Sequence, residues 1–253
     1  MYDFNVHLPS FKSNPNTTDI HAALSELDKL YLEQGFSGGV ITNFDTQYNV
    51  VDFNSELEWK CFIQCKSFNE SDQIWNIKSR GEELEIIGVK IHPRNLGFVP
   101  SVDQLVFAMK QMVNCNRILF ICTYPPIGPG MLGSIDFMSR IVDALSQVPS
   151  AKVVLGHGGV SRILEFSEIA RRFENVFLDI SFTLTRMRRT SVAVDLSWLF
   201  QTLDTRLVFG SDFPDQSLKE SVEAFDYLSQ SLPIEKREKI LSTNARHLGG
   251  FRS

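Results

Sequence analysis

The chain lacks the features that mark secreted, membrane-spanning and disulfide-stapled proteins. Its four cysteines form no paired Cys-x-x-Cys motif, which excludes a disulfide scaffold and a zinc knuckle. No apolar stretch approaches the roughly 18 residues that a membrane-spanning helix needs. The first seven residues have neither the basic nor the apolar segment of a signal peptide. We therefore expect a cytoplasmic protein with reduced thiols and no membrane partner.

Basic charge is scarce as well. The sequence has 25 Lys and Arg residues against 30 Asp and Glu residues, a formal net charge of -5. Its one short basic cluster consists of Arg186, Arg188 and Arg189. Proteins that bind nucleic acids gain most of their affinity by neutralising phosphates with clustered basic side chains. The charge balance therefore argues against nucleic acid as a partner.

Apolar residues, in contrast, are abundant enough for a large core. Hydrophobic residues make up 43% of the chain and charged residues 22%, with 20 phenylalanines supplying most of the aromatic side chains. This composition is not that of a disordered chain. No linker, short-period repeat or low-complexity segment interrupts it, so we expect residues 1–253 to form one domain.

Short β-rich runs alternate with amphipathic helical patterns along the whole chain. Ser101-x-x-Gln104 and Ser217-x-x-Glu220 have the pattern of capping boxes that begin two of the helices. Alternation of this kind indicates βαβ units and a parallel sheet, and eight units favour closure into a (β/α)8 TIM barrel. An open doubly wound sheet is the alternative, although no glycine-rich phosphate loop follows the first run. The eight predicted strands are 4–8, 38–42, 60–65, 86–92, 117–123, 152–157, 175–181 and 206–212.

Polar side chains gather where these predicted strands end. In a (β/α)8 barrel the carboxyl ends of the strands surround the active site, so these side chains are expected to converge. Because side chains alternate along a strand, Asp3, Asn5 and His7 are expected on one face of the first strand. A functional site at the barrel mouth is therefore predicted. The strand-end residues are His7, Asn43, Lys90, His92, Cys122, His157, Asp179, Ser181 and Asp212.

Five pieces of the sequence resemble motifs of the amidohydrolase superfamily. They are, in order, FNVHLP, GVKIHP, VVLGHGG, RLVFGSDFP and STNARHLGG. The resemblance extends from Asp3 to Gly250 and is closest to small single-domain barrels that include metal-dependent hydrolases and non-oxidative aromatic decarboxylases. It implies a TIM barrel of the metal-dependent-hydrolase type.

The resemblance also implies a divalent metal, with zinc the expected ion, but two of the family's ligand positions are changed. The family's first strand carries Asp-x-His-x-His, whereas Asn5 stands here before His7, and Cys122 replaces a histidine of the fifth strand. His7, Cys122 and Asp212 form a conceivable three-ligand zinc set with an open position for water. Neutral Asn5 is a poor zinc ligand. Metal binding is therefore expected to be weaker than in the family, or absent.

The catalytic roles follow from the same resemblance. Asp212 matches the aspartate that acts as general base, His157 matches the histidine that polarises substrate or water, and Lys90 matches the lysine of the fourth strand. These residues predict a hydrolase that cleaves a C–O or C–N bond of a small anionic molecule.

Four further residues are predicted to contact the substrate. Arg186 and Arg188 follow the seventh predicted strand and would clamp an anionic group, with His92 and Ser181 beside them. A solvated loop is the alternative interpretation of the arginines, and a turn into the following loop is the alternative for His92.

Two other functions stay open at this point. A non-catalytic binding or regulatory barrel is favoured by the changes at Asn5 and Cys122, and opposed by the presence of His157 and Asp212. A non-oxidative decarboxylase would use the same residues to stabilise a carbanion-like state. Beyond a small-molecule substrate, the sequence leaves a homo-oligomer possible.

Overall fold

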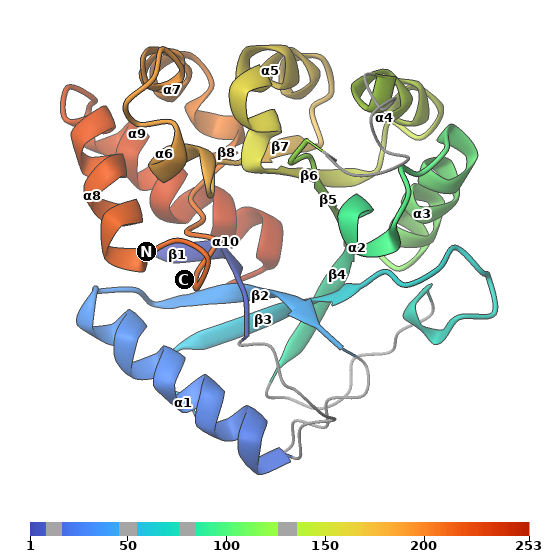
Figure 1. Ribbon diagram of the computed structural model, residues 1–253, viewed down its shortest axis with the longest axis horizontal. Coiled ribbons are helices and arrows are strands. Elements are labelled where there is room, and N and C mark those ends of the chain that lie inside the picture. The colour runs from blue at the N-terminus through green and yellow to red at the C-terminus, as the bar shows by residue number, and fades with distance from the viewer. Residues whose placement is uncertain (9–16, 46–54, 76–83, 126–135, 253) are drawn as a thin grey trace.

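The computed structural model describes residues 1–8, 17–45, 55–75, 84–125 and 136–252. Eight parallel strands follow one another around a barrel in chain order, and helices surround them (Figure 1). The strands are β1 Tyr2–Val6, β2 Gly38–Phe44, β3 Glu58–Gln64, β4 Glu85–Ile91, β5 Ile118–Cys122, β6 Lys152–Gly156, β7 Val176–Asp179 and β8 Leu207–Val208. The helices are α1 Thr17–Glu33, α2 Pro93–Leu96, α3 Val102–Asn114, α4 Phe137–Gln147, α5 Ile163–Arg172, α6 Thr183–Arg186, α7 Val192–Thr202, α8 Leu218–Ser229, α9 Ile234–Glu238 and α10 Asn244–Gly249.

Backbone hydrogen bonds between the first strand and the segment that follows β8 close the barrel. Phe4 N donates to Phe209 O at 2.9 Å, Asp212 N donates to Asn5 O at 2.9 Å, and His7 N donates to Phe213 O at 2.7 Å. The predicted (β/α)8 barrel is confirmed, because every predicted β-rich run overlaps one of the eight strands.

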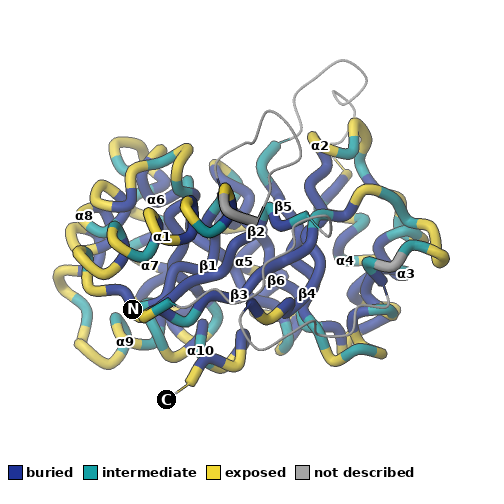
Figure 2. The backbone as a smooth tube through the Cα atoms, turned by 90° about the horizontal axis from the view of Figure 1, so that it is seen from below, coloured by how far each residue is buried: buried dark blue, intermediate teal, exposed yellow. Residues whose placement is uncertain are grey.

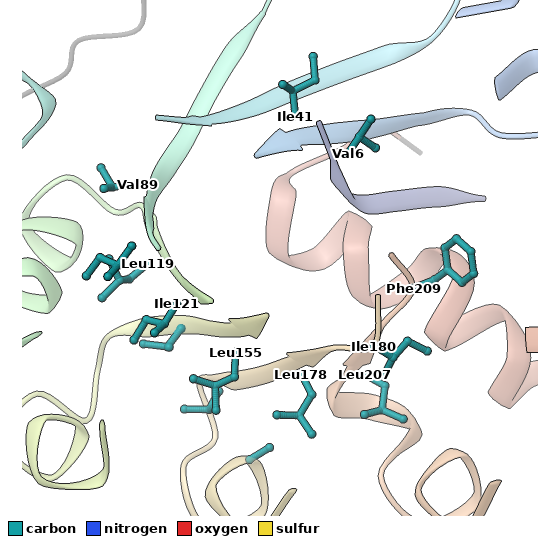
Figure 3. Packing of buried hydrophobic residues seen from close by; sticks show 14 of the residues in the cluster. Val6, Ile41, Val89, Leu119, Ile121, Leu155, Leu178, Ile180, Leu207 and Phe209 are labelled. Atoms are coloured by element: carbon teal, nitrogen blue, oxygen red, sulfur yellow. The ribbon is translucent and has the colours of Figure 1, made fainter. Parts of the chain in front are cut away.

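Two apolar layers hold the barrel together, one on each side of its strands. The outer layer packs the strands against the helices, and Figure 3 shows its members Leu119, Leu155 and Leu178 on β5, β6 and β7. Burial of a leucine side chain contributes about 1.5–3 kcal/mol, so this layer supplies much of the driving force. Figure 2 shows the strands buried along their length while the outer helices expose one face.

The inner layer fills the barrel with large side chains. Phe4, Phe62, Phe120 and Phe177 belong to it, and α10 closes one end with Leu248. The rings of Phe62 and Phe120 lie 5.4 Å apart between centroids. The interior is therefore a packed core, and a polar layer lies above Phe120 at the carboxyl ends of the strands.

The predicted capping box is complete at α3, and the described residues give the Ser217 half of the one predicted at α8. Ser101 Oγ accepts from Gln104 N at 3.2 Å, and the Gln104 side chain accepts from Ser101 N at 2.9 Å, which completes the capping box of α3. At the start of α8, Ser217 Oγ accepts from Glu220 N at 3.3 Å. None of the helices within the described residues is long and apolar enough to cross a membrane.

Candidate functional site

A polar cluster occupies the barrel mouth, and we call it the mouth cluster. Its members come from seven of the strands or the residues just after them, and nearly all are buried. The interior face of β5 places Cys122 two residues beyond Phe120, and that of β7 places Asp179 two residues beyond Phe177, as strand alternation requires. The mouth cluster consists of Asn5, His7, Thr42, Lys90, Cys122, His157, Asp179, Ser181 and Asp212.

The first strand departs from simple alternation, which corrects one prediction. Its pairing with β2 shifts register between Asp3 and Val6. Asp3 therefore points away from the mouth cluster, and its Oδ2 accepts from the Tyr31 hydroxyl of α1 at 2.8 Å. Its burial raises the pKa of the Asp3 carboxyl to about 7. Asp3 consequently does not share a face with Asn5 and His7.

Asn5 is the central hydrogen-bonding residue of the mouth cluster. Its Nδ2 donates to Ser181 Oγ at 2.7 Å, to Asp179 Oδ2 at 3.1 Å and to Asp212 Oδ1 at 3.4 Å. Its Oδ1 accepts from Thr42 Oγ1 at 2.6 Å. The amide thus presents donors to the carboxylate side of the mouth cluster and an acceptor to the other side.

Lys90 fills the centre of that other side. Its Nζ lies 3.0 Å from His7 Nε2, 2.9 Å from Thr42 Oγ1 and 3.4 Å from Asn5 Oδ1. The Phe120 ring lies beneath it, with the centroid 5.0 Å from Nζ. Burial lowers the pKa of Lys90, and the charges of Cys122 and Asp212 oppose this shift. Burial and the nearby Lys90 hold the pKa of His7 well below 6.5, so the imidazole is neutral.

His157 and Cys122 face each other across the mouth. Burial by itself would lower the pKa of His157, but the charge and hydrogen bond of Cys122 outweigh it and raise the pKa to about 9. Burial by itself would raise the pKa of the Cys122 thiol, yet His157 and His92 bring it well below its usual range. The favoured state is an imidazolium paired with a thiolate. His157 Nδ1 also lies 3.0 Å from Ser181 Oγ, which fixes the ring.

Asp212 lies at the edge of the mouth cluster, and its Oδ1 is 3.7 Å from His7 Nε2. Burial raises the pKa of its carboxyl, while His157 and Lys90 oppose that shift. The backbone is strained here, because φ is 66° at Asp212, 62° at His157 and 60° at Phe182. Such left-handed conformations in non-glycine residues cost about 1–3 kcal/mol each and gather at functional sites.

Two of the predicted strand-end residues, Asn43 and His92, make backbone hydrogen bonds outside the mouth cluster. Asn43 does not join the mouth cluster; its side chain bonds both backbone groups of Leu8, at 2.8 Å and 2.9 Å. Thr42, which the sequence reading passed over, points inward instead. His92 accepts from Asn95 N at 3.3 Å through Nδ1, so it caps α2, and it also contacts Cys122. The sequence signal that could have indicated the inward position of Thr42 is its polar side chain within the largely apolar strand Gly38–Phe44.

The predicted substrate contacts fall into two groups. Ser181 lies inside the mouth cluster and is fully buried. Arg186 and Arg189 are exposed and Arg188 is half-buried, next to the carboxyl end of α6. Between described residues, no hydrogen bond or ion pair links the three arginines to the mouth cluster, so their role in binding stays a prediction.

The divalent metal implied by the resemblance to the superfamily does not fit this donor set. Across the described parts of the chain, no three His, Cys, Asp or Glu side chains are grouped so as to hold a metal ion. The expected zinc set of His7, Cys122 and Asp212 is not assembled, because His7 Nε2 faces Lys90 and Cys122 faces His157. Asn5, at the fourth position, turns its amide nitrogen toward the carboxylates and its oxygen toward Thr42 and Lys90.

Solved structures similar to this one are barrels of the same architecture. An uncharacterised TIM-barrel protein of Bordetella bronchiseptica aligns with TM-score 0.68 and 18% identity, covering 98% of this chain and 97% of that one. A dihydroorotase of Campylobacter jejuni aligns with TM-score 0.64 and 14% identity over 100% and 83% of the two chains. An amidohydrolase of Bifidobacterium longum subsp. infantis aligns with TM-score 0.62 and 14% identity over 99% and 98%. At these identities the likeness concerns the fold.

Sequence comparison places the chain more narrowly. No curated protein matches it. The family model described as Amidohydrolase matches residues 18–251, which is most of the chain. The chain therefore belongs to the amidohydrolase family.

Proposed function

We propose that the protein hydrolyses a C–O or C–N bond of a small anionic molecule, with Asp212 as general base and with His157 and Lys90 as the positive charges. The observation that carries this proposal is the buried Asp212 carboxylate near the two cations, at a mouth where the backbone is strained. A general base needs a carboxylate that can accept a proton, and burial raises the pKa of Asp212 in that direction.

The Asp212 carboxylate is less strongly hydrogen-bonded than that of Asp179, so it is better able to accept a proton from water. The hydrogen bond that reaches its carboxylate from Asn5 Nδ2 is long, at 3.4 Å. Asp179, by comparison, accepts from Ser181 Oγ at 2.5 Å, from His157 N at 3.2 Å and from Asn5 Nδ2 at 3.1 Å. Asp179 is thus fixed in place, and Asp212 is the carboxylate suited to activating water.

His157 and Lys90 have different tasks in this proposal. His157 carries a proton at neutral pH, since its pKa is about 9, and its ring is held by Ser181. An imidazolium in a buried site stabilises the oxyanion that forms when water attacks a carbonyl carbon. Lys90 is committed to three acceptors, so it contributes charge to the mouth rather than a proton.

Arginine side chains at the rim of the barrel support the proposal of an anionic substrate. Arg186 and Arg188 lie after β7, and Arg94 lies in α2 after β4 with its guanidinium 4.4 Å from the Tyr124 ring centroid. Arginine is the side chain best suited to a carboxylate or phosphate. A rim of this composition favours a substrate with such a group.

The test is turnover of a panel of carboxylated lactones, esters and cyclic amides by the native protein and by Asp212→Asn. Removal of a general base lowers kcat by about 10²–10⁴-fold. Asp143→Asn, on the exposed face of α4, is the matched control and is expected to retain full activity. Absence of turnover together with tight binding of panel members would instead identify a binding protein. Release of carbon dioxide without hydrolysis would identify a decarboxylase.

A further inference from the structure

We propose that the ammonium group of Lys90 is a built-in cation that takes the place of a divalent metal in the mouth cluster. The proposal deepens the proposed function and rests on it only in taking the mouth cluster as the active site. It explains two features together, namely the asparagine at position 5 and the buried lysine on β4.

The first support is the match between the donors of an ammonium and the acceptors around it. A lysine ammonium has three N–H donors and no acceptor. In the described structure, Lys90 Nζ has three side-chain partners. They are Thr42 Oγ1 on β2 at 2.9 Å, Asn5 Oδ1 on β1 at 3.4 Å, and His7 Nε2 just after β1 at 3.0 Å. The three acceptor atoms are a hydroxyl oxygen, an amide oxygen and an imidazole nitrogen, and none of them belongs to a carboxylate.

The second support is that each acceptor is held in the orientation that the ammonium requires. The Thr42 hydroxyl donates its proton to Asn5 Oδ1 at 2.6 Å, so the lone pairs of its oxygen are left for Lys90. The Asn5 amide donates to Ser181 Oγ at 2.7 Å, which turns its oxygen toward Lys90. His7 Nε2 lies 3.0 Å from Lys90 Nζ, within hydrogen-bonding distance.

The third support is the chemistry of position 5. Asn5 Oδ1 accepts from both Thr42 and Lys90, while its Nδ2 donates to both Ser181 and Asp179. A neutral imidazole has one donor and one acceptor nitrogen, so histidine cannot make these four contacts. Asparagine thus serves an internal cation, whereas histidine serves a metal ion.

The fourth support is competition for His7 Nε2. A zinc ion bound to this nitrogen would lie about 2.0–2.1 Å from it, on the side where Lys90 Nζ already lies at 3.0 Å. Two cations within that distance repel each other strongly in a buried site. Lys90 therefore excludes a metal ion while it balances the charges of Asp179 and Asp212.

The experiment measures binding of Zn²⁺ and Co²⁺ by calorimetry and elemental analysis after dialysis, so it requires no substrate. The native protein is expected to retain far less than one equivalent, with thermal stability unchanged by chelator. Lys90→Ala removes the cation and leaves space among the acceptors. It is expected to bind metal at least about tenfold more tightly, and Asn5→His in the Lys90→Ala background about 10–100-fold more tightly again, the range over which metal-site partners act.

Lys60 provides a matched control. It is also a buried lysine, paired with Glu85 Oε2 at 2.6 Å and 5.2 Å above the Phe251 ring, but it lies at the opposite end of the barrel. Lys60→Ala is expected to leave metal binding unchanged. One tight equivalent of zinc in the native protein, undiminished by Cys122→Ser, would overturn the proposal even if Lys90→Ala failed to fold. A folded Lys90→Ala protein that binds no more metal than the native one would overturn it as well.

Discussion

The Ser181 hydroxyl donates to Asp179 Oδ2 at 2.5 Å. Its Oγ also accepts from Asn5 Nδ2 at 2.7 Å and lies 3.0 Å from His157 Nδ1. This one hydroxyl therefore connects β7 to the ends of β1 and β6. It contacts the imidazole that carries the proposed positive charge directly, and the Asp179 carboxylate holds the hydroxyl in place.

The first prediction follows from that connection. Ser181→Ala removes the hydroxyl that Asn5 Nδ2, His157 Nδ1 and Asp179 Oδ2 share, and loss of a partner by a buried polar group costs about 1–3 kcal/mol. We expect the free energy of unfolding to fall by that amount and kcat to fall with it, as measured by urea denaturation and turnover. Ser229→Ala is the control, because that buried hydroxyl donates to the Phe225 carbonyl of its own helix. Equal effects of the two changes would contradict the prediction.

The second prediction concerns the close packing of Gly210 beneath the carboxylates. A Cβ at Gly210 would lie 2.2 Å from Asp179 Oδ1 and 2.9 Å from Ser181 Cβ. Gly210→Ala must displace Asp179 or the strand, and overpacking of a buried site costs typically 1–3 kcal/mol. We expect lower stability and a large loss of turnover. Gly97→Ala, where φ is 76° and the added Cβ meets open space, is expected to cost only about 1 kcal/mol and to spare turnover.

The sequence predicts the barrel and the strand ends because both depend on local periodicity and composition. Cys122 and Asp179 each follow an interior phenylalanine by two residues, so alternation alone places them at the mouth. Asp3 is misplaced by the same rule, because its strand shifts register against β2, and register depends on contacts far away in the chain.

The partners within the mouth cluster are beyond sequence-based prediction for a similar reason. Lys90 approaches His7 rather than an aspartate, and Cys122 approaches His157 rather than a metal position. The distances between side chains that come from separate strands decide these pairings. The residue types predict a polar site, whereas the three-dimensional arrangement decides which atom holds which proton.

The third prediction concerns the arginines beside α6. If they attract an anionic substrate, replacement of Arg186 and Arg188 by serine raises KM at low ionic strength and leaves kcat nearly unchanged. The effect should shrink at high salt, because exposed charges are screened within about 10 Å at 0.1 M ionic strength. Arg172→Ser, an exposed arginine at the end of α5, is the control. A KM that does not respond to the double change at low salt would assign these arginines to a solvated surface.

The fourth prediction concerns acid stability and begins with the protons held by His157 and Cys122. In the unfolded chain the pKa values are 6.5 and 9.0. In the folded protein, His157 has a pKa of about 9 and the Cys122 thiol a pKa well below its usual range. Between pH 6.5 and 9, both states hold one proton on the pair, so the two linkages cancel. Below pH 6.5 the unfolded chain takes up a second proton that the folded pair refuses.

Stability contributed by the pair is therefore lost as the pH falls below 6.5, with a slope of at most about 1.4 kcal/mol per pH unit. Cys122→Ser removes the thiolate that outweighs burial at His157, so the pKa of His157 is expected to fall from about 9 in the variant. NMR titration of the His157 ring measures this pKa, and urea denaturation at several pH values measures the acid slope of the native protein. Cys61→Ser is the matched control, because burial raises the pKa of the Cys61 thiol and keeps it protonated throughout this range. A His157 pKa that is the same in the native protein and in Cys122→Ser would show that the thiolate and imidazolium pair does not form.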